Sequence, residues 1–320
     1  MSTDKNYKPT TNIKGEFVRK DSQFRNRITA DGSSGFKAEA NRYHLYVSLA
    51  CPWAHRTLIV RKLKGLEKVV SLNVVDWILG KEGWKFDPEK PGATPDTVNN
   101  FGHLSEVYAL SDPEYDGRWT VPVLFDKVQK KIVCNDSAEI IRMLSPEFNE
   151  FCETVEQKEL DLYPEGLRKE IDEMNDWVYP TINNGVYRSG FASSQEAYDS
   201  AVVILFEALE KLENILSTRR YLVGNRFTEA DVRLFTTLIR FDLVYHGHFK
   251  CNKKRIIDYP NIWGYTRDIY QMPGVADTCN FEHITKHYMQ SHRDINPHGI
   301  VAIGPDLDLK APHGRETLGQ

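Results

Sequence analysis

One short stretch, residues 43–56, constrains the fold more than any other part of the chain. Apolar residues alternate along it from Tyr43 to Leu49, which is typical of an extended segment with one buried face. Pro52 then suits the first position of a helix, where its missing N–H is not needed for a hydrogen bond. The stretch therefore predicts a strand, a turn and a helix that begins directly after Cys51.

Cys51 is the residue of this stretch that carries chemistry. A thiol at a helix start lies near unpaired N–H groups and the positive end of the helix dipole, which are expected to lower its pKa and favour the nucleophilic thiolate. The sequence Cys-Pro-Trp-Ala has the first cysteine of a C-x-x-C redox box, with Ala54 in place of the second. A mixed disulfide formed by Cys51 must therefore be resolved by a thiol from outside the box.

Composition limits the class of protein. With 320 residues, 41% hydrophobic and 27% charged, the chain is expected to form a globular protein of about two domains. A net charge of −4 argues against nucleic acid as a partner, and no apolar run is long enough to span a membrane. The polar N-terminus does not resemble a secretory signal, so the cytoplasm is the expected location. Five widely spaced cysteines, an odd number, indicate reduced thiols.

The chain divides into three predicted ranges. Residues 1–40 are a polar extension that lies over the folded body or is partly disordered, residues 41–148 form an α/β domain, and residues 149–320 form a helical domain with a C-terminal tail. The expected elements of the α/β domain are a strand at 43–49, a helix at 52–66, a strand at 69–75, a hairpin at 123–125 and 132–134, and a helix at 138–144. Strand, helix and strand in this order imply a right-handed crossover between parallel neighbours.

A long irregular segment, residues 76–119, separates the second strand from the hairpin. It is rich in Gly and Pro and holds three of the six tryptophans, Trp77, Trp84 and Trp119, which favours a ligand-facing loop over disorder. Pro122 then opens the next strand, and this placement is compatible with a cis peptide bond after Val121.

A second helix start follows the hairpin at Asp136 and Ser137, both of which are strong N-cap types. Its N–H groups suit the carboxylate of a small ligand.

In the second half of the chain, the helical period is clearest at 198–216, and Thr228 with Asp231 has the pattern of a capping box.

Several segments together resemble one family. The segments are CPWAHR at 51–56, WILGKEGW at 77–84, TVPVL at 120–124, NNGVYRSGFA at 183–192, the long run at 228–252 and HYMQSHRDINPHGI at 287–300. In combination they are similar to the glutathionyl-hydroquinone reductases, the Xi class of the glutathione transferases. The resemblance implies a thioredoxin-like N-terminal domain, a C-terminal all-helical domain and a homodimer.

The resemblance also implies site residues. Glutathione would be held by Cys51 together with Trp84, Arg118, Val121, Asp136 and Ser137, and the second substrate by Tyr187, Tyr245 and Tyr288. The acidic residue of the pair at the helix start is commonly Glu, whereas here it is Asp136, whose reach is one methylene shorter. The backbone of Val121 is expected to pair with the cysteinyl unit of glutathione, and Trp84 is expected to cover the tripeptide.

The implied reaction removes glutathione from a glutathionyl-hydroquinone, with a second glutathione as co-substrate and no metal. Tyr187 is the candidate proton donor to the ring carbon that bears sulfur, and Cys51 then attacks that sulfur. Tyr245 and Tyr288 are the candidate hydrogen-bond donors to the thiolate.

Two alternatives remain open from the sequence. An omega-like thiol transferase acting on mixed disulfides would also use Cys51, and a non-catalytic transferase-like binding module would need no activated thiol. His283 and His287 are spaced to face one metal ion, but the glutamate of the zinc-protease motif is missing.

Overall fold

The computed structural model of the protein describes residues 9–319, and these form two compact units. The described part of the first unit comprises residues 20–161 and 277–299, and that of the second comprises 9–19, 162–276 and 300–319. Because both units are discontinuous in sequence, the predicted ranges 1–40, 41–148 and 149–320 do not map onto them one to one. As domain boundaries they stay a prediction, and the part of the extension at 1–8 lies outside the described residues.

The first unit is built on a four-stranded sheet with the order β2-β1-β5-β6. The strands are β1 (Tyr43–Val47), β2 (Ser71–Val74), β5 (Val123–Asp126) and β6 (Lys131–Cys134). β1 is parallel to β2 and antiparallel to β5, and β5 pairs with β6 as a hairpin. This confirms the predicted parallel pair and the predicted hairpin. β1 and β2 are shorter than the sequence suggested, whereas β5 and β6 are each one residue longer.

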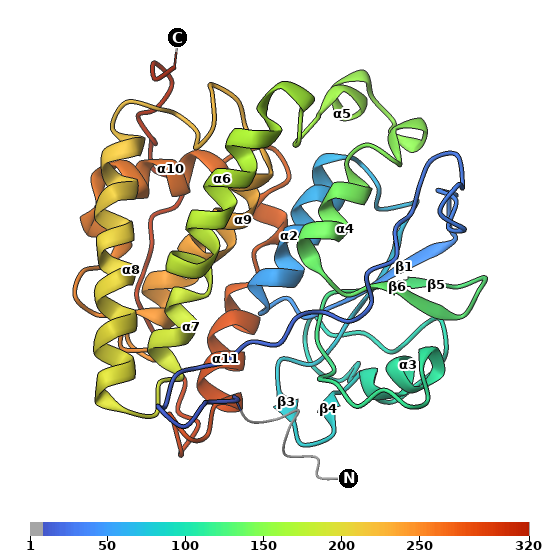
Figure 1. Ribbon diagram of the computed structural model, residues 1–320, viewed down its shortest axis with the longest axis horizontal. Coiled ribbons are helices and arrows are strands. Elements are labelled where there is room, and N and C mark those ends of the chain that lie inside the picture. Colours follow the sequence, from blue (N-terminus) through green and yellow to red (C-terminus); the bar gives the residue numbers. More distant parts are fainter. Residues whose placement is uncertain (1–8, 320) are drawn as a thin grey trace. The chain divides into compact units, whose positions relative to one another are not determined.

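Helices cover this sheet on both faces. α2 (Pro52–Leu63) and α4 (Ser137–Leu144) lie side by side, and Figure 1 shows α3 (Leu104–Ser111) on the other side of the strands. α3 falls inside the segment that was expected to be irregular. Its start is stabilised by a capping box of His103 and Glu106, and histidine is not among the residues that usually signal a helix start.

The remaining elements of the first unit include a segment from the C-terminal part of the chain. They are the short hairpin β3 (Leu79–Gly80) and β4 (Gly83–Trp84), the turn η1 (Asn149–Phe151), α5 (Val155–Glu159), most of the turn η6 (Ala276–Thr278) and α11 (Phe281–Ser291). α11 contacts β3, and the Ser291 hydroxyl accepts a hydrogen bond of 3.0 Å from the N–H of Leu79. The loop that follows β2 is therefore held against a helix some 200 residues later in the chain.

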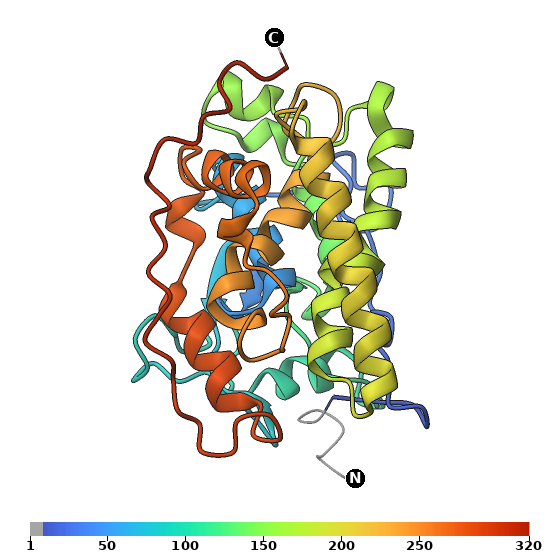
Figure 2. The same cartoon turned by 90° about the vertical axis from the view of Figure 1, so that its left-hand side faces the viewer.

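The named elements in the described residues of the second unit are all helical. They are η2 (Glu165–Leu167), α6 (Arg168–Val178), η3 (Tyr179–Asn183), α7 (Gly185–Gly190), α8 (Gln195–Leu216), α9 (Glu229–Arg240), η4 (Phe241–Tyr245), η5 (Ile256–Asp258) and α10 (Pro260–Tyr270). The long α8, yellow in Figures 1 and 2, packs along α7 and also contacts α10. The predicted capping box of Thr228 and Asp231 is present at the start of α9.

The N-terminal segment runs along both units in turn. Residues 9–19 belong to the second unit, where Gly15 accepts a backbone hydrogen bond from Ser193. Residues 24–26 lie antiparallel to the β6 end, where Asn26 donates to the Val133 carbonyl and Asn135 to the Phe24 carbonyl. The described part of the extension is thus bonded to the folded body.

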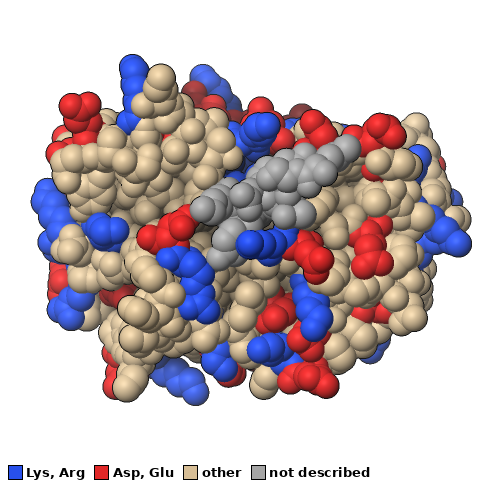
Figure 3. Space-filling model, turned by 90° about the horizontal axis from the view of Figure 1, so that it is seen from below, with Lys and Arg blue, Asp and Glu red and all other residues tan. Residues whose placement is uncertain are grey.

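The surface shows no segregation of charge on the face that Figure 3 displays, where acidic and basic side chains are interspersed. Among residues 9–319, no helix is both long and apolar enough to cross a membrane.

Candidate active site

The start of α2 places Cys51 as predicted. Cys51 is the N-cap residue with an extended backbone, its own side chain makes no capping hydrogen bond, and Pro52 occupies the first helical turn. The thiol is partly exposed and its Sγ lies 3.5 Å from the carbonyl oxygen of Val121. A carbonyl accepts hydrogen bonds only, so this contact belongs to the protonated thiol, and the thiolate expected from the sequence stays a prediction.

Val121 precedes a cis peptide bond to Pro122, as the sequence allowed. The residue before it, Thr120, is held by the Tyr108 hydroxyl, which donates to the Thr120 carbonyl at 2.8 Å. Tyr108 accepts in turn from the side-chain amide of Asn135 at 3.0 Å. These contacts fix the backbone that carries the acceptor for Cys51.

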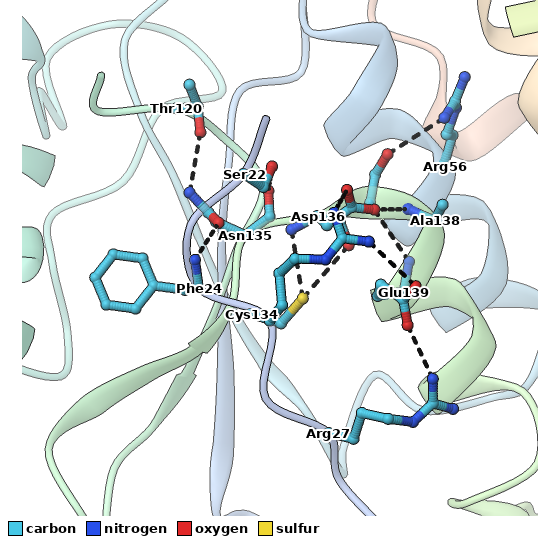
Figure 4. A network of polar contacts seen from close by, with 12 residues as sticks. Ser22, Phe24, Arg27, Arg56, Thr120, Cys134, Asn135, Asp136, Ala138 and Glu139 are labelled. Carbon is cyan, nitrogen blue, oxygen red and sulfur yellow. Dashed lines mark hydrogen bonds and ion pairs between the residues drawn. The ribbon is translucent and has the colours of Figure 1, made fainter. Parts of the chain in front are cut away.

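The start of α4 is a second helix end in the same unit. The side chain of Asp136 is the N-cap, and its Oδ1 accepts from the N–H groups of Ala138 at 2.9 Å and Glu139 at 3.2 Å. The N–H of Ser137 makes no hydrogen bond within the described part of the chain. Figure 4 shows Asp136 between Ala138, Glu139 and the side chain of Cys134. The predicted helix start is therefore present, and anion binding at the N–H of Ser137 stays a prediction.

Trp84 lies on the short β3–β4 hairpin and is buried, with 5% of its surface exposed. Its ring stacks on His287 of α11, with centroids 5.2 Å apart. His287 Nδ1 lies 2.7 Å from the Trp77 carbonyl, and the Trp77 indole donates to Gln290. Trp84 is thus packed between the loop and α11, and its predicted role in covering glutathione stays a prediction.

Tyr288 lies on α11 and belongs to the first unit, together with Cys51. It is 1% exposed, and its ring makes edge contacts with His287 and His292 at 5.2 and 5.4 Å. Arg118 also belongs to this unit and is partly exposed, and its carbonyl accepts from the Tyr115 hydroxyl at 2.8 Å.

Tyr187 and Tyr245 belong to the second unit, where they lie in one aromatic cluster. Their ring centroids are 6.0 Å apart, and both rings pack at 5.5 Å against Phe249. Tyr187 is 9% exposed and Tyr245 is fully buried. Tyr245 ends the π-helical turn η4, and Tyr187 follows the π-helical turn η3; such turns are frequent at functional sites.

Three arginines contact the candidate residues and were not assigned from the sequence. Arg56 of α2 donates to the Ser137 hydroxyl at 3.3 Å. Arg25 contacts Asp136 at 3.4 Å, and the guanidinium of Arg19 lies 4.9 Å from the centre of the Tyr187 ring. Only Arg56 had a sequence signal, since it belongs to the CPWAHR segment; Arg19 and Arg25 lie in the extension, which has no period or motif.

The other thiols differ from Cys51. Cys134 and Cys251 are buried, and burial raises the pKa of each to about 12. Cys152 is partly exposed and its pKa is also raised by burial, while Cys279 lies 3.8 Å from His55 Nε2. All five cysteines are free. Cys51 therefore remains the candidate nucleophile.

The two histidines considered as metal ligands make other contacts. His283 Nε2 lies 2.7 Å from the Pro91 carbonyl, and His287 contacts Trp77. Over residues 9–319, no group of three or more His, Cys, Asp or Glu side chains is arranged to hold a metal ion.

Comparison with known proteins identifies the class to which this fold and site belong. Residues 50–146 match the family model of the glutathione S-transferase N-terminal domain, and residues 195–268 match that of the C-terminal domain. The chain belongs to the glutathione S-transferase family, and within it to the Xi-class glutathionyl-hydroquinone reductases.

Individual relatives support the class assignment. The chain is 56% identical to the glutathionyl-hydroquinone reductase YqjG of Escherichia coli, over 96% of this chain and 94% of that protein. The glutathione-bound structure of YqjG has a TM-score of 0.89 at 56% identity, covering 92% of this chain and 96% of that one. The Xi glutathione S-transferase of Phanerochaete chrysosporium also has a TM-score of 0.89, at 54% identity, covering 92% and 95% of the two chains.

Proposed function

We propose that the protein uses glutathione to reduce glutathionyl-hydroquinones to hydroquinones. The observation that carries this proposal is the position of Cys51: it is the N-cap residue of α2, its thiol lies beside Val121, and its redox box has no second cysteine. Such a thiol can take up one glutathione as a mixed disulfide and then needs another to release it. The relationship to YqjG, whose name states this activity, supports the choice of substrate.

The proposed cycle begins with a proton shift on the aromatic conjugate. Tyr187 gives its proton to the ring carbon that bears sulfur and recovers one from a ring hydroxyl, which converts the hydroquinone to its keto tautomer. The Cys51 thiolate then attacks the glutathione sulfur. A sulfur–sulfur bond forms, the carbon–sulfur bond breaks, and its electron pair restores the aromatic ring.

A second glutathione completes the cycle. Its thiolate attacks the glutathione sulfur of the mixed disulfide, releases the Cys51 thiolate and leaves as oxidised glutathione. The aromatic ring gains two electrons, and they come from two sulfurs, that of the conjugate's own glutathionyl group and that of the second glutathione; the thiol proton of the second glutathione goes to the hydroquinone oxygen. Tyr245 and Tyr288 serve in this proposal as hydrogen-bond donors to the thiolate of Cys51.

Glutathione binding in this proposal uses the first unit. The N–H of Ser137 meets the γ-glutamyl carboxylate, Asp136 accepts from the ammonium, the Val121 backbone pairs with the cysteinyl unit, and Trp84 and Arg118 complete the site. A homodimer and a cytoplasmic location belong to the same proposal. The five free cysteines support a reducing compartment.

The test is chromatography of a glutathionyl-hydroquinone incubated with excess glutathione and either the native protein or Cys51→Ala. The expected result is free hydroquinone and oxidised glutathione with the native protein alone. If the native protein reduces a simple mixed disulfide but not the conjugate, the thiol transferase becomes the better assignment. Inactivity on both substrates would indicate a binding module.

A further inference from the structure

Arg56 is a buried cation at the predicted carboxylate end of the glutathione site. It lies on α2, five residues after Cys51, and only 2% of its surface is exposed. Its guanidinium lies 4.5 Å from the centre of the Trp53 ring and donates from Nη1 to the Ser137 hydroxyl at 3.3 Å. Figure 4 shows this contact reaching the start of α4 from α2.

The direction of this hydrogen bond determines what Ser137 offers to a ligand. A guanidinium carries donors only, so the Ser137 oxygen accepts from Arg56 and keeps its own proton for another acceptor. Within residues 9–319, no acceptor for that proton is present, and the N–H of Ser137 is likewise open. Ser137 is 7% exposed, so its hydroxyl and its N–H are two donors of a nearly buried residue that a ligand can satisfy.

Two parallel donors at a helix start match the two oxygens of a carboxylate. We propose that Arg56 is a positioning residue for glutathione: it fixes the Ser137 hydroxyl as a donor and adds positive charge behind it, and so selects the γ-glutamyl carboxylate. This inference rests on the proposed function for its ligand, and it assigns Arg56 no contact with the reacting sulfur.

The test compares two peptides that differ only in the carboxylate. One is glutathione, and the other carries a 4-aminobutanoyl group in place of the γ-glutamyl group. Affinities are measured by titration calorimetry in a Cys51→Ser background, which prevents mixed disulfides. The readout is the preference ratio, defined as the affinity for glutathione divided by the affinity for the analogue.

Arg56→Met is expected to lower the preference ratio about tenfold, and Ser137→Ala to lower it by a similar factor. The preference ratio of the double variant should fall no further than that of either single variant, because both substitutions remove the same interaction with the carboxylate. Arg61→Met is the matched control: Arg61 lies on the same helix, but its guanidinium donates to the Val70 and Glu67 carbonyls. Its preference ratio should not change.

A merely structural role for Arg56 gives a different result. Arg56→Met would then weaken both peptides equally and leave the ratio unchanged, which would overturn the inference; losses that multiply in the double variant would also overturn it. If circular dichroism shows that Arg56→Met is unfolded, Arg56→Gln replaces it, with an expected loss of roughly threefold. An unchanged preference ratio in Arg56→Gln would also overturn the inference.

The outcome is separate from that of the reductase assay, because the titration uses no aromatic substrate. Absence of glutathione binding in the Arg56-containing protein would remove both proposals. An unchanged ratio alongside hydroquinone production would remove only the role of Arg56.

Discussion

The candidate glutathione-binding residues of the first unit and the tyrosines of the second unit are held in place in different ways. In the first unit the groups belong to element ends and backbone: Cys51 and Asp136 are N-cap residues, and Val121 precedes the strand β5. In the second unit Tyr187 and Tyr245 are held by ring packing around Phe249. Cys51, Asp136 and Val121 are therefore positioned by the backbone at element ends, whereas Tyr187 and Tyr245 are positioned by aromatic contact, as Trp84 of the first unit is by His287.

This difference indicates which substitutions each group of candidate residues tolerates without loss of structure. A group fixed by a helix start keeps its place when its side chain is altered conservatively, because the backbone does not depend on it. A phenol in a packed cluster keeps its ring position when only the hydroxyl is removed. Substitutions can therefore separate chemistry from folding in both units.

The largest effect is expected for Cys51→Ser. The proposed nucleophile is lost while the helix start keeps Pro52, so turnover of both the conjugate and a simple mixed disulfide should fall by about 10³-fold or more. Steady-state assays on both substrates provide the measurement. Retention of turnover on either one would show that another group attacks that substrate.

Tyr187→Phe should affect one substrate only. Loss of the proton donor is expected to slow reduction of the aromatic conjugate by about 10²-fold and leave reduction of the mixed disulfide nearly unchanged. Tyr198→Phe is the matched control, since the Tyr198 hydroxyl donates to the Lys250 carbonyl in the same unit. Equal losses on both substrates would remove Tyr187 from the proton-donor role.

Asp136 allows capping and ligand binding to be separated. Asp136→Asn keeps a good N-cap but loses the charge, so the KM for glutathione should rise about tenfold with little change in stability. Asp136→Ala should raise KM similarly and also cost about 1 kcal/mol of unfolding free energy. Kinetics and urea titration of the two variants give both quantities. An unchanged KM in Asp136→Asn would argue against the ammonium contact.

The smallest effect concerns the buried thiols, one in each unit. Because burial raises the pKa of Cys134 and Cys251 to about 12 in the folded state, the unfolded chain ionises first as pH rises. Their contribution to stability is therefore present below pH about 9 and decreases between about 9 and 12. Urea titrations across this range should show a shallower loss of stability in Cys134→Ala than in the native protein; identical slopes would contradict the assignment.

Much of the first unit was predictable because its signals are local. The alternation before Cys51, the proline after it and the N-cap types at 136–137 each act within a few residues, and they predicted β1, α2 and the start of α4. α3 was missed because its start depends on His103, an unusual cap. The contacts of Trp84 with His287 and of Arg25 with Asp136 join parts of the chain that are far apart in sequence. No local sequence pattern predicts either contact.

The strand-like pairing of residues 24–26 with the β6 end has a consequence for solubility. β6 is the last strand of the sheet, and an uncovered last strand presents a row of N–H and C=O groups that a strand of another molecule can join. The N-terminal segment occupies part of that row. Removing the first thirty or so residues would therefore expose the unpaired N–H and C=O groups of the edge strand β6, and the shortened protein would self-associate.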